Sequence, residues 1–416
     1  MKALGLFEGY GIEIELMIVD AKTLCVRPLA ERLLQDATGQ VENERSLDGV
    51  RISNELAAHV IEFKTDGPVR EFSGLMEPFR LAVDHVQARL APLGARLLGT
   101  GMHPFMDPFR EAVLWPYGQR EIYRAYDRIF DCRGHGWVNL QSVHLNLPFC
   151  GAEEFGRLHG AIRCVLPLIP ALCASTPMAD GRLTGLSDTR LSVYRHNQAR
   201  VPEIAGHIIP EAVFGPQAYA NEILEPMYKA IAPLDPSGIL HGEWLNSRGA
   251  IARFDRSAIE IRLVDTQEAV EMDLAVIALV AAAVRGFVEE RLASFETQKK
   301  AETQTLAALL HETIARGEDA QITSPSLLKL YGLSSPVQAG DLWKIWYEKL
   351  AGHCPELGFD KGLVEERLTG GTLASRIRKA LGENPGPERI FKVYALLAHC
   401  QSTGKPFEGK GLQGDF

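Results

Sequence analysis

Gly11-Ile-Glu-Ile-Glu-Leu16 alternates apolar and acidic residues near the start of the chain. On a β-strand, residues i and i+2 point to the same face, so Glu13 and Glu15 share one face while Ile12 and Ile14 share the other. Their Cα atoms would lie about 6.5 Å apart, and two carboxylates at that spacing repel each other unless a cation lies beside them. The stretch predicts a strand whose acidic face binds a metal ion; a solvated edge strand is the alternative.

Two later stretches repeat this pattern of paired polar residues. Val143-His-Leu-Asn-Leu147 places His144 and Asn146 on one face, and Ile259-Glu-Ile-Arg-Leu263 does the same for Glu260 and Arg262. A neutral imidazole can bind a metal or donate to a phosphate oxygen, and a guanidinium offers a forked, permanently charged set of donors. A hydrogen-bonded histidine and a structural ion pair are the alternatives. The three stretches together carry the groups that bind a divalent metal and a phosphate.

Three further residues are candidates. Glu62 lies on a predicted strand over residues 58–65, whereas Glu55 precedes it by an odd number of residues. An odd offset cannot share a face of one straight strand, so Glu55 either reaches the site from the preceding turn or is an ordinary turn acid. Arg190 ends a loop of small and hydroxyl residues that starts at Ser175, and it could hold a carboxylate through two hydrogen bonds. A surface loop is the alternative.

The bulk composition limits the classes of function. With 416 residues, 46% hydrophobic and 23% charged, the chain suits one large catalytic domain and a smaller region. The net charge of −9 and the lack of a Lys/Arg run argue against a nucleic-acid or anionic-membrane partner. The longest apolar run, 274–284, is shorter than the roughly 20 residues of a membrane span, and the seven scattered cysteines suit a reducing compartment. We therefore expect a cytoplasmic protein with small-molecule partners; a homo-oligomer is an open option.

Periodicity predicts the order of elements. Strands are expected over 10–20, 58–65, 97–100, 137–147 and within 250–264, and helices over 28–38, 70–97, 118–130, 152–174 and 269–296. After about residue 297 only helices are expected. This pattern predicts an α+β fold with a catalytic domain over 1–296 and a helical C-terminal region over 297–416.

Read in order, these segments resemble the type 2 glutamate–cysteine ligase family, the bacterial carboxylate–amine ligases. The resemblance covers about residues 8–290, and its matching stretches are Gly11 to Glu15, Glu55 to Thr65, Gly101-Met-His-Pro104, Val143 to Asn146, Ser175 to Arg190, and Glu260 to Arg262 with Asp265. The chain departs from the family pattern at Asn146, where His is usual, and at Ser175-Thr-Pro177, where Asn-Ser-Pro is usual.

The resemblance implies a fold related to glutamine synthetase, with a curved antiparallel sheet, flanking helices and ATP in a funnel. On matching positions it implies that the metal-binding residues are Glu13, Glu15, Glu55, Glu62, Glu260 and His144. His144 and Asn146 would also lie near the nucleotide. Arg262 would stabilise the transferring phosphoryl group, and Arg190 would meet the carboxylates of the acyl substrate. The implied cofactors are ATP and Mg²⁺, with Mn²⁺ as the alternative ion.

The sequence thus predicts an ATP-dependent ligase that forms an amide of the γ-glutamyl type through an acyl phosphate. Two alternatives are a phosphotransferase of the same fold that acts on a guanidino group, and a non-catalytic sensor of a nucleotide or metabolite. The departure at Asn146 motivates the sensor, and the presence of all five candidate acids argues against it. Neither the amine nor the acyl donor can be identified from the sequence.

Overall fold

The computed structural model of the chain describes residues 4–409. Within that range, eight strands form one antiparallel sheet in the order β2-β3-β4-β1-β6-β10-β9, with β5 pairing to β1. The strands are β1 (Gly11–Asp20), β2 (Glu44–Leu47), β3 (Val50–Asn54), β4 (Val60–Thr65), β5 (Ala95–Leu98), β6 (Ser142–Pro148), β9 (Ala250–Arg253) and β10 (Ala258–Asp265). The predicted α+β class with an antiparallel sheet is confirmed.

Strand β1 lies inside the sheet, and its two faces differ in polarity. Ile12, Ile14, Leu16 and Ile18 are fully buried in the main hydrophobic core. The intervening residues, beginning with Glu13, point to the opposite face, as the alternation predicts. The sheet therefore has one apolar face that is covered by helices and one face that carries the acids.

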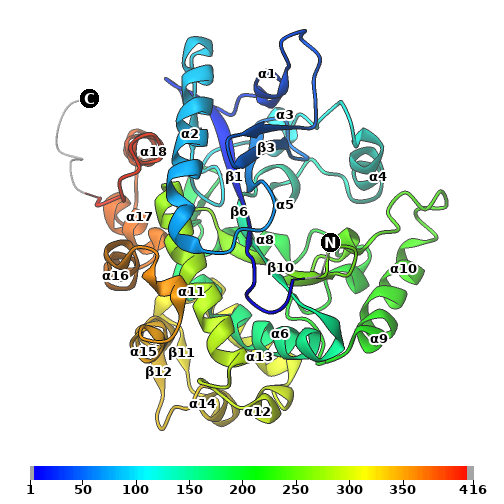
Figure 1. Ribbon diagram of the computed structural model, residues 1–416. Coiled ribbons are helices and arrows are strands. Elements are labelled where there is room, and N and C mark those ends of the chain that lie inside the picture. The colour runs from blue at the N-terminus through cyan, green and yellow to red at the C-terminus, as the bar shows by residue number, and fades with distance from the viewer. Residues whose placement is uncertain (1–3, 410–416) are drawn as a thin grey trace.

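The helices surround this sheet on both sides (Figure 1). In chain order they are α1 (Ala30–Leu34), α2 (Met76–Leu90), α3 (Pro108–Glu111), α4 (Arg120–Phe130), α5 (His135–Val138), α6 (Gly151–Val165), α7 (Ile169–Cys173), α8 (Thr189–Tyr194), α9 (Pro216–Tyr219), α10 (Glu225–Ile231), α11 (Val270–Val288), α12 (Phe295–Lys299), α13 (Thr303–Arg316), α14 (Pro325–Leu330), α15 (Ala339–Leu350), α16 (Lys361–Gly370), α17 (Leu373–Leu381) and α18 (Pro387–Thr403). Helices α2, α6 and α11 contact the sheet strands and pack on the apolar face. Helices α4 and α10 lie on the other side (Figure 1).

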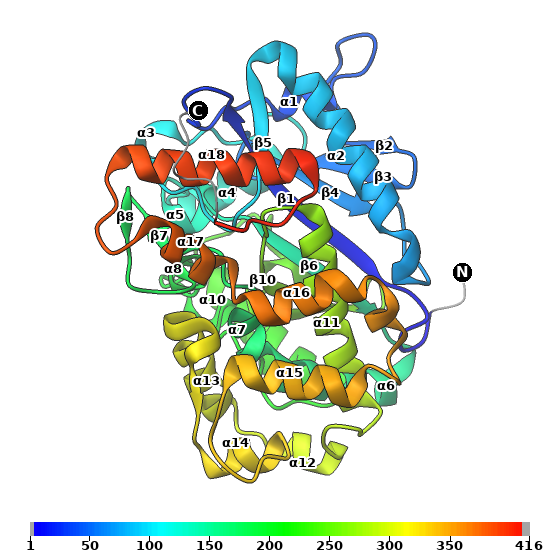
Figure 2. The same cartoon turned by 90° about the vertical axis from the view of Figure 1, so that its left-hand side faces the viewer.

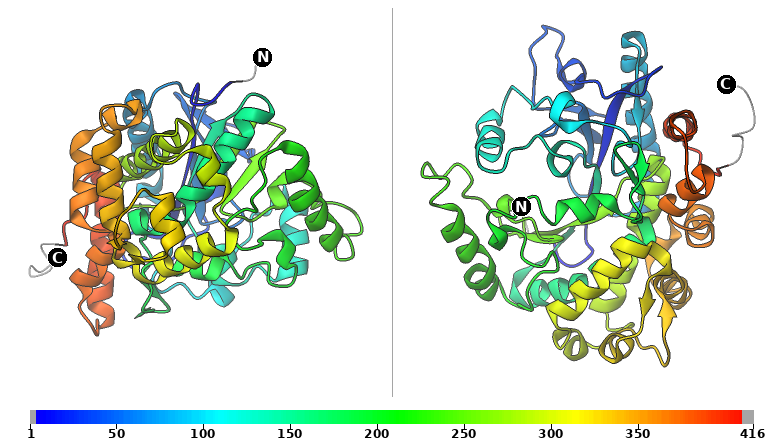
Figure 3. Two further views of the ribbon diagram at one scale, coloured as in Figure 1. Left: turned by 90° about the horizontal axis from the view of Figure 1, so that it is seen from below. Right: turned by 180° about the vertical axis from the view of Figure 1, so that it is seen from behind.

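The C-terminal helices pack back onto the first part of the chain rather than extending away from it. Helices α15 to α18 lie side by side along one flank (Figures 2 and 3), with α16 against α11 and α18 against α2 and β5. Residues of α17 and α18 form a second core with Met17 and Val19, which lie on the same face of β1 as the acids. The C-terminal region therefore covers the end of the polar face that the acids leave free.

Three details differ from the sequence-based expectations. Residues 137–141 do not belong to the strand, because α5 occupies His135–Val138 and β6 begins only at Ser142. The expected helix over 269–296 is divided into α11 and α12, and the C-terminal region contains a short ribbon of β11 (Gln321–Ile322) and β12 (Val337–Gln338). Helices α5 and α12 and strands β11 and β12 have two to five residues each, which is too few for periodicity to identify them.

The hairpin β2–β3 was missed although the sequence carries a signal for it. Asp48 and Gly49 connect the two strands, with Leu47 paired to Val50. Both connecting residues have positive φ, 41° and 92°, and Asp-Gly is a favoured pair for such a two-residue turn. This hairpin places β3 beside β4 and brings the end of β3 to the polar face.

A β-bulge in β10 changes which residues share that face. The register with β6 runs from Ile261 opposite Leu145 to Val264 opposite Val143, so β10 contains one extra residue there. Beyond the bulge, Asp265 lies opposite Ser142 and points to the polar side of the sheet. Its odd spacing from Glu260 would otherwise have placed it on the opposite face.

Among residues 4–409, no helix combines the length and the apolar character that crossing a lipid bilayer requires.

Candidate active site

A cavity of about 780 Å³ opens on the polar face of the sheet. Its floor is formed by side chains of β1, β3, β4, β6 and β10, and its walls by α4, by α8 and by the segment before β9. Of the nine candidate residues, eight line this one cavity: Glu13, Glu15, Glu55, Glu62, His144, Arg190, Glu260 and Arg262. The structure thus brings together side chains that are up to 249 positions apart in the sequence, counted from Glu13 to Arg262.

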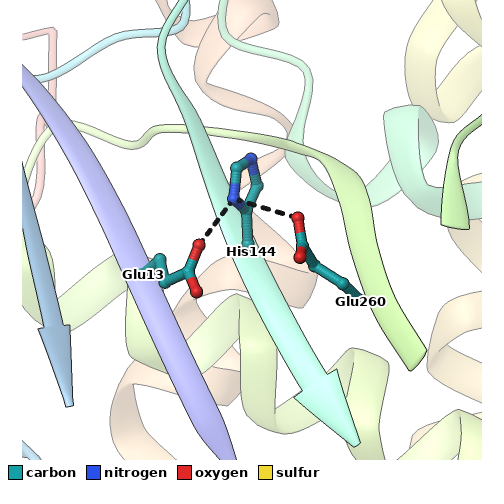
Figure 4. A group of neighbouring side chains, drawn as sticks. All are labelled: Glu13, His144 and Glu260. Carbon is teal, nitrogen blue, oxygen red and sulfur yellow. Dashed lines mark hydrogen bonds and ion pairs between the residues drawn. The ribbon is translucent and has the colours of Figure 1, made fainter. Parts of the chain in front are cut away.

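Glu13, His144 and Glu260 form a compact group on three adjacent strands (Figure 4). Glu13 lies opposite His144 in the β1–β6 register, and His144 Nδ1 is 3.0 Å from Glu13 Oε2 and 3.7 Å from a carboxylate oxygen of Glu260. One ligand atom from each residue lies within 4.8 Å of the other two. The imidazole therefore lies between two carboxylates that could surround a single cation.

The charges in this group strongly perturb one another. Burial alone would raise the pKa of Glu13, but the hydrogen bond and the charge of His144 outweigh it and lower that pKa to about 2. Burial likewise opposes protonation of His144, whereas Glu13, Glu15 and Glu260 raise its pKa to about 9. At neutral pH an imidazolium therefore neutralises part of the acidic group.

A second set of acids lies on the β3–β4 side of the cavity. Glu62 pairs with Glu15 in the β1–β4 register, and Glu55 reaches the cavity from the connection that follows β3. Burial and the repulsion of Glu62 and Glu15 raise the pKa of Glu55 well above its ordinary value. Burial and the charge of Glu13 raise the pKa of Glu62 to about 7, although Lys64 lies 3.3 Å away. The positive charge of Lys64 therefore does not offset the burial and the mutual repulsion of Glu55 and Glu62.

Glu15 differs from the other acids because the protein satisfies one of its oxygens. Its Oε2 accepts hydrogen bonds from the backbone N–H of Ser142 at 2.7 Å and from the hydroxyl of the same residue at 3.1 Å. The Ser142 hydroxyl also lies 3.0 Å from His144 Nε2. Ser142 therefore orients both an acid and the imidazole.

Arg262 and Arg190 are held by anions of the same strand, β10. Arg262 Nε donates to Glu260 at 2.6 Å, and the nearby carboxylates, Glu260 first, raise its pKa despite burial. Arg190 is 1% exposed; its Nε donates to Asp265 and its Nη2 donates to the carbonyl of Leu263 at 2.8 Å. Both guanidinium groups are thus fixed in place while still lining the cavity.

Asn146 is the ninth candidate, and its side chain supports an acid. Its amide nitrogen donates to Glu13 Oε1 at 3.2 Å. It is not among the residues that line the cavity.

Sequence reasoning missed the aromatic wall of the cavity. Tyr123 and Tyr126 of α4 line it together with Trp137, Tyr194 and Trp244. The ring centroid of Tyr126 is 5.3 Å from that of Trp137 and 6.1 Å from that of Trp244. The apolar spacing of α4 was visible in the sequence, but it reads equally well as an ordinary core face. Arg253, 3.7 Å from Glu260, was also missed, because it ends a short edge strand.

The residues present fit a hard divalent cation. Carboxylate oxygens are the ligands that Mg²⁺ and Mn²⁺ prefer, and an imidazole nitrogen is compatible with the second of these ions. One cation could be held by Glu13, His144 and Glu260, whose ligand atoms lie close together. A cation beside Glu55 and Glu62 would reduce the repulsion between their carboxylates.

Comparison with known proteins adds a family and a fold. Residues 10–327 match the model of glutamate–cysteine ligase family 2. A protein of Archaeoglobus fulgidus without an assigned function is 39% identical over 264 residues, which are 63% of this chain and 70% of that protein. A protein of Rubrobacter xylanophilus, provisionally named glutamate–cysteine ligase 2-1, is 27% identical over 402 residues and 94% of both chains.

Solved structures show the same fold at low sequence identity. The crystal structure of glutamate–cysteine ligase from Francisella tularensis in complex with AMP has a TM-score of 0.57 at 10% identity, covering 97% of this chain and 90% of that chain. A bifunctional glutathione synthetase from Pasteurella multocida also has a TM-score of 0.57, at 14% identity, and covers 95% of this chain. The match spans only 52% of that longer protein.

Proposed function

The chain belongs to glutamate–cysteine ligase family 2, and from this membership we propose that it is an ATP-dependent ligase that joins a carboxylic acid to an amine. The observation that carries the proposal is the convergence of five acids, an imidazole and two fixed guanidinium groups in one cavity. Family membership alone would suit a protein that had lost its activity, but a cavity in which burial and repulsion raise the pKa values of Glu55 and Glu62 has the chemistry of a site for a metal–nucleotide complex.

Within this proposal, Mg²⁺ or Mn²⁺ would be held by Glu13, His144 and Glu260, and by Glu15, Glu55 and Glu62. Bound there, a divalent cation would supply positive charge to the phosphates of ATP. His144 would release its proton when the cation binds, because a metal ligand must be the neutral imidazole. Ser142 and Asn146 would keep His144, Glu15 and Glu13 oriented through the hydrogen bonds described above.

The proposed chemistry has two steps that need positioning and charge rather than a protein nucleophile. A carboxylate oxygen of the acyl donor attacks the γ-phosphorus of ATP in line, the bond to the bridging oxygen of ADP breaks, and an acyl phosphate forms. The amine nitrogen then attacks the acyl carbon, loses a proton and displaces phosphate, which leaves an amide. Arg262, held by Glu260, would stabilise the charge on the transferring phosphoryl oxygens.

The substrates proposed are a small amino dicarboxylate of the glutamate type and an amine of unassigned structure. The catalytic groups named here all belong to residues 1–296, so we assign this part as the catalytic domain and the helices after residue 297 as its support.

The test is ATP turnover with the purified full-length chain, Mg²⁺, L-glutamate and a panel of amino acids and amines. We expect free phosphate only when both an acid and an amine are present, and an amide product by mass spectrometry. Free phosphate from ATP alone, or no turnover with any pair, contradicts the proposal. A phosphorylated nitrogen product without free phosphate would instead identify a guanidino phosphotransferase.

A further inference from the structure

Arg190 is held in the cavity wall by a buried hydrogen-bond network. Asp265 accepts from Arg190 Nε, from the backbone N–H of Ser175 at 2.7 Å and from the hydroxyl of Thr176 at 3.2 Å. Thr176 Oγ1 in turn accepts from the backbone N–H of Arg190 at 3.1 Å. Each of these four residues is at most 1% exposed. The position of the Arg190 guanidinium therefore depends on three segments: the one that starts at Ser175, helix α8 and the end of β10.

Helix α17 is hydrogen-bonded beside all three segments, although it does not itself line the cavity. Its contacts are the backbone N–H of Ala374 to the carbonyl of Ala174 at 2.8 Å, Arg376 to both carboxylate oxygens of Glu268, and Arg378 Nη1 to the hydroxyl of Ser187 at 3.1 Å. The three residues that it contacts lie one to three positions along the chain from Ser175, Asp265 and Arg190, respectively. One helix of the C-terminal region thus holds every segment of the network.

The contact at Ser187 acts most directly on Arg190. Ser187 is fully buried, and its backbone N–H and that of Asp188 donate to carbonyls at the end of α13, at 3.2 and 3.0 Å. Arg378 adds a hydrogen bond from a charged donor to the Ser187 hydroxyl, and such bonds are stronger than those between neutral groups. Asp188 follows directly and caps the start of α8. A displacement of Ser187 would therefore move the first turn of the helix that carries Arg190.

We propose that helix α17 positions Arg190 in the cavity, and that Arg378 does so by holding Ser187 in place just before α8. Arg378 is a positioning residue, because it acts on the cavity only through α8. The inference rests on the proposed ligase function for what Arg190 binds, and it gives the C-terminal region a direct role in the site. Helix α17 lies beyond residues 10–327, which match the family model, so family membership does not imply this role.

The first test is hydrogen–deuterium exchange on the full-length chain without ligands. Arg378→Met removes the donors and keeps an apolar stem. The backbone amides of α8 should exchange about tenfold faster in this variant, because the lost hydrogen bond from a charged group favours local opening. Ser187→Ala removes the other side of the contact, and the double variant should exchange no faster than the faster single variant. Lys379→Met is the matched control, because Lys379 is exposed on the same helix.

Turnover gives the second readout. Arg378→Met should raise the KM for L-glutamate about tenfold and leave the KM for ATP and kcat at saturation within about twofold, because a displaced Arg190 weakens the binding of one substrate only. Arg378→Lys, which restores one charged donor, should recover most of this loss. A fall in kcat with both KM values unchanged contradicts the inference, since that result indicates a smaller folded fraction.

The exchange data decide the inference independently of turnover. Exchange of α8 that is unchanged in Arg378→Met, or that is equally fast throughout the chain, overturns it. If exchange rises selectively in α8 but no pair of substrates releases phosphate, the ligase proposal fails while the positioning of Arg190 by α17 stands.

Discussion

The charged residues on the two sides of β1 differ in how they are paired. On the apolar side, Tyr10 just before β1 contacts Glu356 and Arg285; Arg285 Nε donates to Glu356 at 2.7 Å, and its Nη2 donates to the Tyr10 hydroxyl at 2.9 Å. On the polar side, Glu13 and Glu15 begin a row of acids in one cavity, where burial and repulsion raise the pKa values of Glu55 and Glu62. In the first group the guanidinium lies directly against a carboxylate, whereas in the second the acids repel one another.

This difference separates charges that hold the fold from charges that await a ligand. In the Tyr10 group, the guanidinium of Arg285 meets the carboxylate of Glu356 at 2.7 Å and that of Glu289 at 3.4 Å, so its charge is offset within the protein. In the cavity, burial and mutual repulsion raise the pKa values of Glu55 and Glu62, which means that ionising them costs stability. A fold tolerates such a cost at a functional site more readily than elsewhere.

The largest expected effect comes from neutralising one acid of the polar face. Glu13→Gln keeps the size of the side chain but removes a charge that His144 and the proposed cation both face. We expect kcat to fall by roughly 10²–10³-fold, the scale found when one charge-stabilising group is removed from an active site. Steady-state turnover measures the change. The matched control is Glu77→Gln, because Glu77 is an exposed acid on α2. Full activity of Glu13→Gln would show that Glu13 does not belong to the proposed site.

The opposite result is expected on the apolar side. Glu356 is 1% exposed, so Glu356→Gln removes the buried one of the two carboxylates that contact Arg285 and leaves only the more exposed Glu289. Breaking a buried pair by removing one partner costs about 3–5 kcal/mol, so the free energy of unfolding should fall by about 3 kcal/mol while kcat stays near the wild-type value. Denaturant unfolding measures the first quantity. A large loss of activity in protein that is still folded would show that the two faces are not separate in function.

The same contrast explains how far the sequence predicts this molecule. The alternation in Gly11 to Leu16 depends only on local backbone geometry, so it correctly predicts the strand and its two faces. The antiparallel α+β class and the family are confirmed as well. Glu13, Glu15 and Glu260 could be named as candidates in advance because their strands carry i, i+2 polar pairs.

The features that the sequence could not show depend on strand register and on contacts between residues far apart in the chain. The single extra residue in β10 turns Asp265 to the polar side of the sheet, and no local pattern marks it. Arg190 could be named as a candidate, but not its pairing with Asp265, because a residue 75 positions away supplies the anion. The sequence predicts the helix over 118–130 but not the aromatic wall, since a helix with regularly spaced apolar residues looks the same whether it faces a core or a cavity.

A cation should stabilise the protein through the polar face. A ligand that binds only the folded state at 100 times its Kd adds about 2.7 kcal/mol. We expect Mg²⁺ or Mn²⁺ to raise the melting temperature by a few degrees over a sample in chelator, as measured by differential scanning fluorimetry. Glu62→Gln should weaken this rise, whereas Glu356→Gln should lower both melting temperatures and keep the difference between them. An equal response of both variants, or none in the wild type, would argue against a cation among these acids.

The smallest expected effect concerns buried histidines that stay neutral in the folded protein. His59 is 1% exposed, and burial, with the neighbouring His103, lowers its pKa to about 3; burial lowers the pKa of His103 to about 4. The unfolded chain takes up protons on both rings below about pH 6.5, whereas the folded chain keeps them neutral, so stability falls as the pH falls. At one pH unit below 6.5, each ring should lower the free energy of unfolding by about 1 kcal/mol. Unfolding in saturating Mg²⁺, so that the cavity acids stay occupied, should show this slope in the wild type and in His85→Gln, an exposed histidine. His159, whose pKa burial also lowers to about 3, contributes an equal share, so His59→Phe should lose about a third of the slope. A slope that stays unchanged would mean that the protons are taken up elsewhere.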